Sequence, residues 1–156
     1  MRIRSLTEDD IPKLAAIVAE NYDAHCAQMF YPDARCALSD GPWRPRFLVA
    51  TVDDEPVGCS CWSVDWSSWG VFNICWVQVE KCHQGRGIGK DLIDATLAEL
   101  RPQATLILLS TSLKGYYERW GFEPLCNYRS AYVYDGSEQE TLMALRSTAA
   151  RDAAGQ

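Results

Sequence analysis

The sequence lacks any long apolar run, which excludes a helix that spans a membrane. Such a helix needs about 20 consecutive apolar residues, and no uncharged apolar stretch approaches that length. A secretory leader is not expected either, because four acidic residues interrupt the first twenty positions. The expected location is therefore cytoplasmic.

Clusters of basic residues are also missing. The chain has 15 lysines and arginines against 21 aspartates and glutamates, a net charge of −6. Domains that bind nucleic acid normally carry a clustered basic face, so neither DNA nor RNA is an expected partner. An acidic protein attracts cationic small molecules instead.

Cysteine spacings typical of zinc sites do not occur. The seven cysteines include one C-x-C and no C-x-x-C pair, and without an export signal we expect reduced thiols packed as small hydrophobic groups. Cys75, Cys82, His83 and Cys126 are conceivable ligands, but no second cysteine pair supports them. No metal is therefore expected.

The remaining composition is that of one globular domain. Apolar residues make up 47% of the 156 and charged residues 23%, which are ordinary values, and a domain usually has about 100–200 residues. No repeat or low-complexity segment occurs. We expect one domain over residues 1–146, followed by a small, polar and frayed tail over residues 147–156.

Hydrophobic periodicity predicts a chain that mixes strands and helices. Thr7, Asp10 and Pro12 are start signals for a helix that ends near residues 23–27. Residues 28–45 contain three prolines, so we expect a loop with a short helix near 34–38. Further helices are predicted over 88–100 and 113–120. The predicted strands are 2–6, 46–52, 57–66, 71–79, 106–109, 126–134 and 141–146.

One segment, residues 77–90, stands apart because a strand runs into three alternating glycines and then into an amphipathic helix. Glycines let backbone N–H groups approach a ligand closely, and a helix N-terminus adds unpaired donors and about half a positive charge. Together these features bind phosphate or pyrophosphate. The alternative is a glycine-rich turn that only joins strand to helix.

Common phosphate-binding motifs do not fit this segment. The spacing is G-x-G-x-G rather than the G-x-G-x-x-G of dinucleotide folds, and it follows antiparallel strands. A P-loop requires Ser or Thr after its Gly-Lys, whereas Asp91 follows Lys90. An RNA-recognition motif would need aromatic residues after Gly87, and Ile88 and the acidic charge argue against it.

The pattern Gln84-x-x-Gly87-x-Gly89 resembles the Q/R-x-x-G-x-G/A motif of the GCN5-related N-acetyltransferases, the GNAT superfamily. Residues 116–122 resemble that family's F/Y-Y-E-x-x-G-F segment, and residues 3–10 and 49–58 resemble its opening and its second hairpin. The resemblance covers residues 2–122. It implies an α/β (α+β) fold with a mixed, mostly antiparallel central sheet of roughly six to seven strands and about four helices.

The resemblance also implies a site for acetyl-CoA as cosubstrate. Backbone N–H and C=O groups of Val77 and Val79 would bind the acetyl group and the pantetheine arm, and residues 84–90 would wrap the pyrophosphate. Tyr117 would lie near the thioester sulfur. The coenzyme-binding residues implied are Val77, Gln78, Val79, Gln84, Gly85, Arg86, Gly87, Ile88, Gly89, Lys90, Ser110 and Tyr117.

The chain departs from the family at two positions. Asn73 stands where some members carry a glutamate base, and Ser110 stands where the family has asparagine. Asn cannot accept the proton of an ammonium group. The candidate bases are then Asp65, Glu80 and Asp23, or an ordered water chain; we select Asp65 with Tyr117 as the catalytic pair, although Asp65 fits a solvated strand end equally well.

Tryptophans 62, 66, 69 and 76 are concentrated in the middle of the chain. Each alone is expected in the core, and together they could form an aromatic wall for a cationic or flat substrate.

The function expected is transfer of acetyl from acetyl-CoA to a primary amine of a small molecule or peptide. The alternative is a non-catalytic module that holds acyl-CoA as a sensor or partner subunit. No membrane or nucleic acid is an expected partner, and a second copy of the chain, forming a homodimer, is a candidate one.

Overall fold

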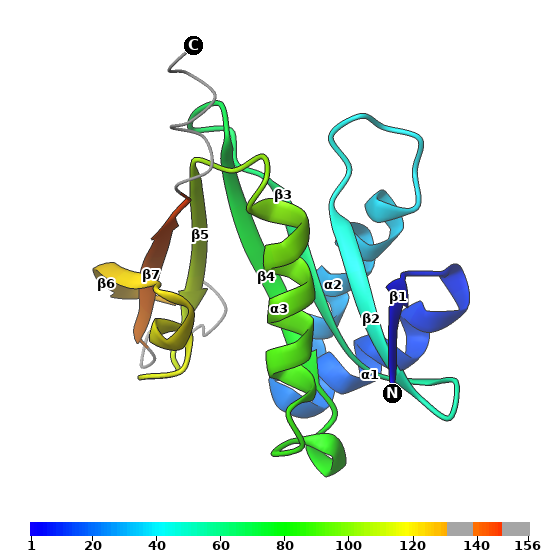
Figure 1. Cartoon of the computed structure of the whole chain (residues 1–156). Coiled ribbons are helices and arrows are strands. Elements are labelled where there is room, and N and C mark those ends of the chain that lie inside the picture. Colours follow the sequence, from blue (N-terminus) through cyan, green and yellow to red (C-terminus); the bar gives the residue numbers. More distant parts are fainter. Residues whose placement is uncertain (131–138, 148–156) are drawn as a thin grey trace. The chain divides into compact units, whose positions relative to one another are not determined.

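The structure is a computed structural model that describes residues 1–130 and 139–147 (Figure 1). Its contacts divide the chain into two compact units. The first unit comprises Met1–Ser63 and Cys75–Glu99, and the second comprises Val64–Ile74 and the chain from Leu100 onward.

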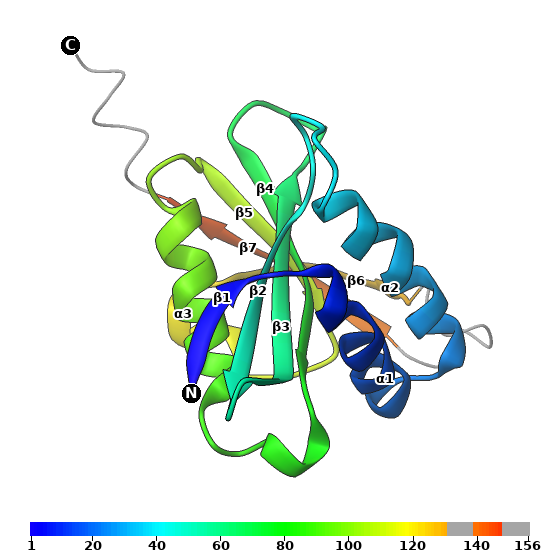
Figure 2. The same ribbon diagram turned by 90° about the vertical axis from the view of Figure 1, so that its right-hand side faces the viewer.

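The first unit is a layer of strands between helices (Figure 2). Helices α1 and α2 cover one face of its strands and α3 covers the other. The strands are β1 (Arg2–Ser5), β2 (Arg46–Val52), β3 (Glu55–Val64) and the second half of β4 (Val71–Val79). The helices are α1 (Ile11–Asn21), α2 (Ala24–Ala37) and α3 (Ile88–Leu100).

Alternation along β2 explains these two layers. Phe47 and Val49 belong to the core beneath α1 and α2, whereas Leu48 and Ala50 pack with α3. Successive side chains of a strand point to opposite faces, so an apolar run of this length is stable only with helices on both sides. β2 pairs antiparallel with β1 and with β3.

The second unit contains the first half of β4 with β5 (Leu106–Thr111), β6 (Glu123–Arg129) and β7 (Gln139–Arg146). β4 pairs parallel with β5 from Val71↔Leu106 to Ile74↔Leu109, and β7 pairs antiparallel with β5 and with β6. Ile107 and Leu109 of β5 are buried, as expected for the apolar run at this point of the sequence.

The fold class expected from the sequence is confirmed. The strands pair in the order β1-β2-β3-β4-β5-β7-β6, and β4–β5 is the parallel pair. Three α-helices occur among the described residues rather than the expected four, with short 3-10 turns beside them. No described helix has the length and apolar character needed to cross a membrane.

The expected loop over residues 28–45 is wrong for its first part, because α2 occupies Ala24–Ala37. Asp23 begins this helix by accepting a hydrogen bond from the Cys26 N–H at 2.8 Å. The helix then continues through Pro32, and its buried residues form one apolar stripe: Cys26, Ala27, Phe30 and Ala34. Burial of that stripe outweighs the hydrogen bond that a proline inside a helix removes.

The helix expected over residues 113–120 is also shorter than predicted. The structure has one 3-10 turn, η3 (Tyr117–Trp120), which ends at Gly121 with a positive φ of 91°. β6 ends at Arg129. The turn expected at residues 135–136 and the tail after residue 147 lie outside the described residues.

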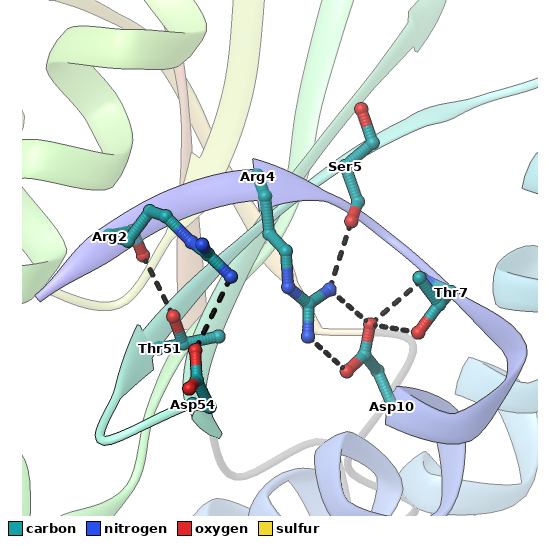
Figure 3. A network of polar contacts seen from close by, with 7 residues as sticks. All are labelled: Arg2, Arg4, Ser5, Thr7, Asp10, Thr51 and Asp54. Carbon is teal, nitrogen blue, oxygen red and sulfur yellow. Dashed lines mark hydrogen bonds and ion pairs between the residues drawn. The ribbon is translucent and has the colours of Figure 1, made fainter.

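A partly buried ion pair between Arg4 and Asp10 fixes the start of the chain (Figure 3). Both Asp10 carboxylate oxygens accept from the Arg4 guanidinium at 2.6 and 2.7 Å, and Oδ2 also accepts from the Thr7 N–H and hydroxyl at 2.8 Å. Burial by itself raises the pKa of Asp10, but the hydrogen bonds from Arg4 and Thr7 outweigh it, and the pKa is lowered. The network joins β1 to the turn before α1.

Replacing Asp10 with Ala should lower the free energy of unfolding by about 3 kcal/mol, because it leaves the Arg4 charge without its partner. Asp9→Ala removes an exposed carboxylate from the neighbouring position and should change the stability little. Urea denaturation measures both. Because the pKa of Asp10 is lowered by folding, its contribution is complete above the ordinary aspartate pKa of about 3.9 and declines as the pH falls below it. Equal stabilities of Asp10→Ala and Asp9→Ala at neutral pH would contradict this account.

Candidate functional site

The end of β4 and the loop after it form a backbone-lined segment of the first unit. Glu80 N–H donates to the Val57 carbonyl at 2.8 Å, and Asp65 N–H donates to the Val71 carbonyl at 2.9 Å. The two strands, β3 and β4, therefore run antiparallel. Hydrogen-bonded and non-bonded positions alternate in such a ladder, so the backbone groups of Val77 and Val79 point away from β3. Within the first unit that side is the edge of the strand layer.

Gly58 permits the close approach of β3 to this part of β4. A Cβ atom at Gly58 would lie 2.5 Å from the Gln78 carbonyl oxygen and 3.3 Å from the Val79 Cα. Real Cβ atoms do not approach backbone this closely, so any other residue at position 58 would displace the end of β4.

The Val79 carbonyl is the anchor of the segment. It accepts from Asn21 Nδ2 at 3.1 Å and from Gln84 Nε2 at 2.9 Å. Asn21 Nδ2 also donates to Oε1 of the buried Gln78 at 2.9 Å. A carbonyl oxygen has two lone pairs, so both are used, and the end of β4 is fixed to α1 and to the loop at once.

The loop after β4 uses two glycines in the left-handed region. Gly85 has a φ of 75° and Gly87 a φ of 87°, and, apart from the adjacent residues, no atom lies within 4 Å of a Cβ built at either position. Glycine is therefore required by backbone conformation and not by space. Asp91 N–H donates to the Gly87 carbonyl at 3.0 Å, so α3 begins immediately after Gly87. The N–H groups of its first turn have no acceptor within the helix.

Of the two basic side chains near this loop, one is paired with a carboxylate and the other, in the described part of the chain, is not. Lys90 Nζ pairs with Asp94 Oδ2 at 2.5 Å, one turn further along α3. Arg86 is exposed and, within residues 1–130 and 139–147, makes no ion pair. The unpaired N–H groups, the helix dipole and the Arg86 guanidinium all favour an anion at this position.

Both candidate bases of the first unit, Glu80 and Asp23, already take part in hydrogen bonds or ion pairs. Glu80 forms an ion pair with Lys13 of α1 and lies 3.0 Å from His83 Nδ1; the hydrogen bond from Lys13 lowers its pKa. Asp23 accepts a hydrogen bond from the Cys26 N–H at the start of α2, and the hydrogen bonds from the backbone and side chain of Cys26 lower its pKa. Neither carboxylate is poised to hold a proton near neutral pH.

In the second unit, Asp65 stabilises the turn between β3 and β4. Its Oδ1 accepts from the Ser67 N–H at 2.8 Å, and hydrogen bonds from the Ser67 side chain and N–H lower the pKa of Asp65. The contact matches the solvated strand-end alternative for this residue.

Ser110 and Tyr117 also belong to the second unit. Ser110 is exposed on β5. Tyr117 is buried in η3 and packs edge-on against Tyr116, with ring centroids 5.0 Å apart, and against Phe122 at 6.1 Å. The structure thus gathers the predicted residues of 77–90 in one segment of the first unit and places Asp65, Ser110 and Tyr117 in the second.

Trp62 and Trp76 do not share the aromatic wall that the sequence left open, and the core position expected for each tryptophan is wrong for Trp66 and Trp69. Trp62 donates to Glu99 of α3 and Trp76 donates to Asp33 of α2, each at 2.7 Å, so these two rings lie on opposite faces of the first unit. Trp66 and Trp69 are 78% and 88% exposed. Hydrogen bonds to separate helices override the sequence proximity of the rings.

Sequence reasoning missed the residues that hold the segment from outside it. Gly58, Asn21 and Lys13 lie 19, 56 and 64 residues before Val77, and none belongs to the glycine-loop motif. The pairing of β3 with β4 could have marked Gly58, because glycine inside a strand often signals a close backbone approach.

Comparison with known proteins agrees with this geometry. A family model described as an acetyltransferase (GNAT) domain matches residues 43–124, and the chain belongs to this family of acetyl-transferring enzymes. No curated protein gives a significant match.

Solved structures share the fold at low identity. A Desulfovibrio desulfuricans protein assigned to the GNAT family is 19% identical with a TM-score of 0.79, covering 94% of this chain and 99% of its own. The ribosomal-protein-S18-alanine N-acetyltransferase of Escherichia coli is 21% identical with a TM-score of 0.71, covering 94% and 93%. An aminoglycoside 6'-N-acetyltransferase complexed with coenzyme A is 16% identical with a TM-score of 0.69, covering 94% and 97%.

Replacing Asn21 with Asp should destabilise the end of β4. The variant has nearly the same shape, but it sets a carboxylate oxygen against the Val79 carbonyl and the Gln78 side-chain oxygen. Loss of donors to these groups should lower the free energy of unfolding by about 1–3 kcal/mol. Glu20→Gln, at the preceding and more exposed position, is the matched control. Urea denaturation that ranks the two variants equally would contradict the anchoring role.

Proposed function

We propose that the chain transfers an acetyl group from acetyl-CoA to a primary amine of a small molecule or peptide. The observation that carries the proposal is the loop at residues 84–87, where two left-handed glycines lead into the N-terminus of α3. A diphosphate of coenzyme A suits this arrangement of N–H groups and positive potential. The bound coenzyme of the aminoglycoside-acetylating neighbour supports the same ligand.

The edge of β4 suits the remaining part of the coenzyme. The Val79 carbonyl already has two donors, so we assign the N–H of Val79 to the ligand. The backbone groups of Val77 would bind the acetyl and pantetheine groups. An N–H that donates to the thioester oxygen stabilises the negative charge that forms there when an amine attacks.

In the proposed reaction, the amine nitrogen bonds to the acetyl carbon and the carbon–sulfur bond breaks. The sulfur departs as a thiolate, whose thiol has an ordinary pKa of about 8.5. Tyr117, with a reference pKa of about 10, donates a proton or hydrogen bond to that sulfur. The ammonium proton of the acceptor must leave before attack. After attack the nitrogen gives up a second proton, which balances the proton that the sulfur takes up.

We assign removal of that proton to an ordered water chain that delivers it to bulk solvent, rather than to a carboxylate. Asp23, Asp65 and Glu80 each accept structural hydrogen bonds, and the pKa of each is lowered. A base with a lowered pKa takes a proton poorly near neutral pH. Asp65→Asn should therefore retain turnover. The alternative function is that of a sensor, which would bind acyl-CoA at the same site but would not transfer the acyl group.

Gly87→Asp should weaken binding of coenzyme A by about tenfold or more, because its carboxylate meets the diphosphate at close range. Gly87→Asn is the matched control, since Asn and Asp have the same shape and tolerate a positive φ similarly. Isothermal titration calorimetry measures both. Equal binding by the two variants, or no heat from the unmodified chain, would refute the proposed coenzyme site.

Tyr117→Phe should lower kcat about 100-fold if the hydroxyl acts on the sulfur, while coenzyme binding is retained. Tyr116→Phe removes the adjacent hydroxyl and should keep full activity. Thiol release from acetyl-CoA over a panel of polyamines, amino acids, peptides and aminoglycosides provides the assay. Coenzyme binding without turnover for every amine would favour the sensor function over the enzyme.

A further inference from the structure

The turn between β4 and the glycine loop brings three different metal-binding side chains together. Glu80, Cys82 and His83 each place one potential ligand atom within 4.8 Å of the other two. His83 Nδ1 lies 3.0 Å from Glu80 Oε2 and 3.1 Å from Cys82 Sγ. Cys75 and Cys126, which the sequence offered beside Cys82 and His83, do not belong to this cluster.

The backbone holds the three side chains in place. The turn is the 3-10 segment η2 (Lys81–His83), closed by a 2.8 Å hydrogen bond from the His83 N–H to the Glu80 carbonyl. Residues three apart in such a turn lie on the same side, which brings Glu80 and His83 together. Glu80 itself is fixed to β3 through its N–H and the Val57 carbonyl.

The Glu80 carboxylate is also oriented from outside the turn. Its Oε1 is bound by Lys13 of α1, whereas its Oε2 faces His83. The Lys13 charge lies on the oxygen that a metal would not use. A metal ligand held by a second group in this way is oriented before the metal arrives.

Two of the three donor distances, from His83 Nδ1 to Cys82 Sγ and to Glu80 Oε2, are close to those that zinc requires, and the third pair of ligand atoms lies within 4.8 Å. Tetrahedral Zn²⁺, with bonds of about 2.3 Å to sulfur and about 2.0–2.1 Å to nitrogen, places these two ligand atoms about 3.5 Å apart. Nitrogen and oxygen ligands would lie about 3.4 Å apart. The observed distances differ from these by a few tenths of an ångström, which side-chain rotation supplies.

The chemistry of the donors selects a class of metal. One thiol, one imidazole and one carboxylate suit Zn²⁺ or Co²⁺ rather than Mg²⁺ or Ca²⁺, which prefer oxygen. The thiol must lose its proton to the buffer when the metal binds. The thiolate and the carboxylate then balance the two positive charges. Cys82 is exposed, so water can reach the fourth position.

We infer that Glu80, Cys82 and His83 form a binding site for Zn²⁺ that fastens the turn leading into Gln84. The site consists of the chain's own side chains and does not rest on the proposed acetyl transfer. A metal ion that binds the folded state but not the unfolded state raises the thermal stability of the chain. Zn²⁺ should therefore do so here.

Competition for Zn²⁺ against a chromophoric chelator, in a reductant free of thiols, tests the site. The full chain should take up one equivalent, and Cys82→Ser, His83→Gln and Glu80→Gln should each weaken binding about tenfold or more. Co²⁺ should give a thiolate-to-cobalt absorption band that Cys82→Ser abolishes. Far-ultraviolet circular dichroism verifies that each variant is folded.

Two controls separate a three-ligand metal site from a single reactive thiol and from the loss of an ion pair. Cys36→Ser removes an exposed thiol elsewhere in the first unit and should leave Zn²⁺ affinity unchanged. Lys13→Gln breaks the same ion pair as Glu80→Gln but keeps all three ligands, so it should retain or strengthen binding. The inference is overturned if Cys82→Ser binds like the unmodified chain. It is also overturned if His83→Gln and Glu80→Gln both do so, because only a surface thiol would then be involved.

Discussion

The arrangement of the candidate site depends on one carbonyl oxygen, that of Val79, which accepts two amide donors. One donor comes from Asn21 at the end of α1 and the other from Gln84 at the start of the glycine loop. The hydrogen bond from Asn21 fixes where β4 ends relative to α1, and the hydrogen bond from Gln84 fixes where the loop begins. Gly58 also allows β3 to lie close to β4 at this point. Three separate stretches of sequence, at Asn21, Gly58 and Gln84, therefore define the position of a single backbone segment.

This support explains how a loop of glycines can present a defined surface. Gly85 and Gly87 adopt a backbone that other residues resist, and glycine carries the greatest loss of chain entropy on folding. The ordered ends reduce the freedom that remains between them. The result is a short, curved run of N–H groups that meets the start of α3, with the Arg86 side chain exposed beside it.

Much of the fold could be predicted because local pattern and tertiary packing agree. The apolar alternation of 46–52, the helical spacing of 88–100 and the glycine loop all correspond to elements in the structure. The helix α2 could not be predicted, because Pro32 is a local signal against it and the burial of Phe30 is a long-range effect. The opposite faces of Trp62 and Trp76 depend on partners in α3 and α2. The motif residues of the site could likewise be predicted, because they are adjacent in the sequence. The residues that anchor them could not, because they are far from the motif in the sequence.

Helix α1 meets the same short stretch of chain at two points along its length. Lys13, in its first turn, binds Glu80, and Asn21, its last residue, binds Gln78 and Val79. Rolling the helix about its axis would break both attachments together. The amides of α1 and of residues 78–83 therefore form one cooperative unit for local opening, and in hydrogen exchange they would become exposed to solvent as a single block.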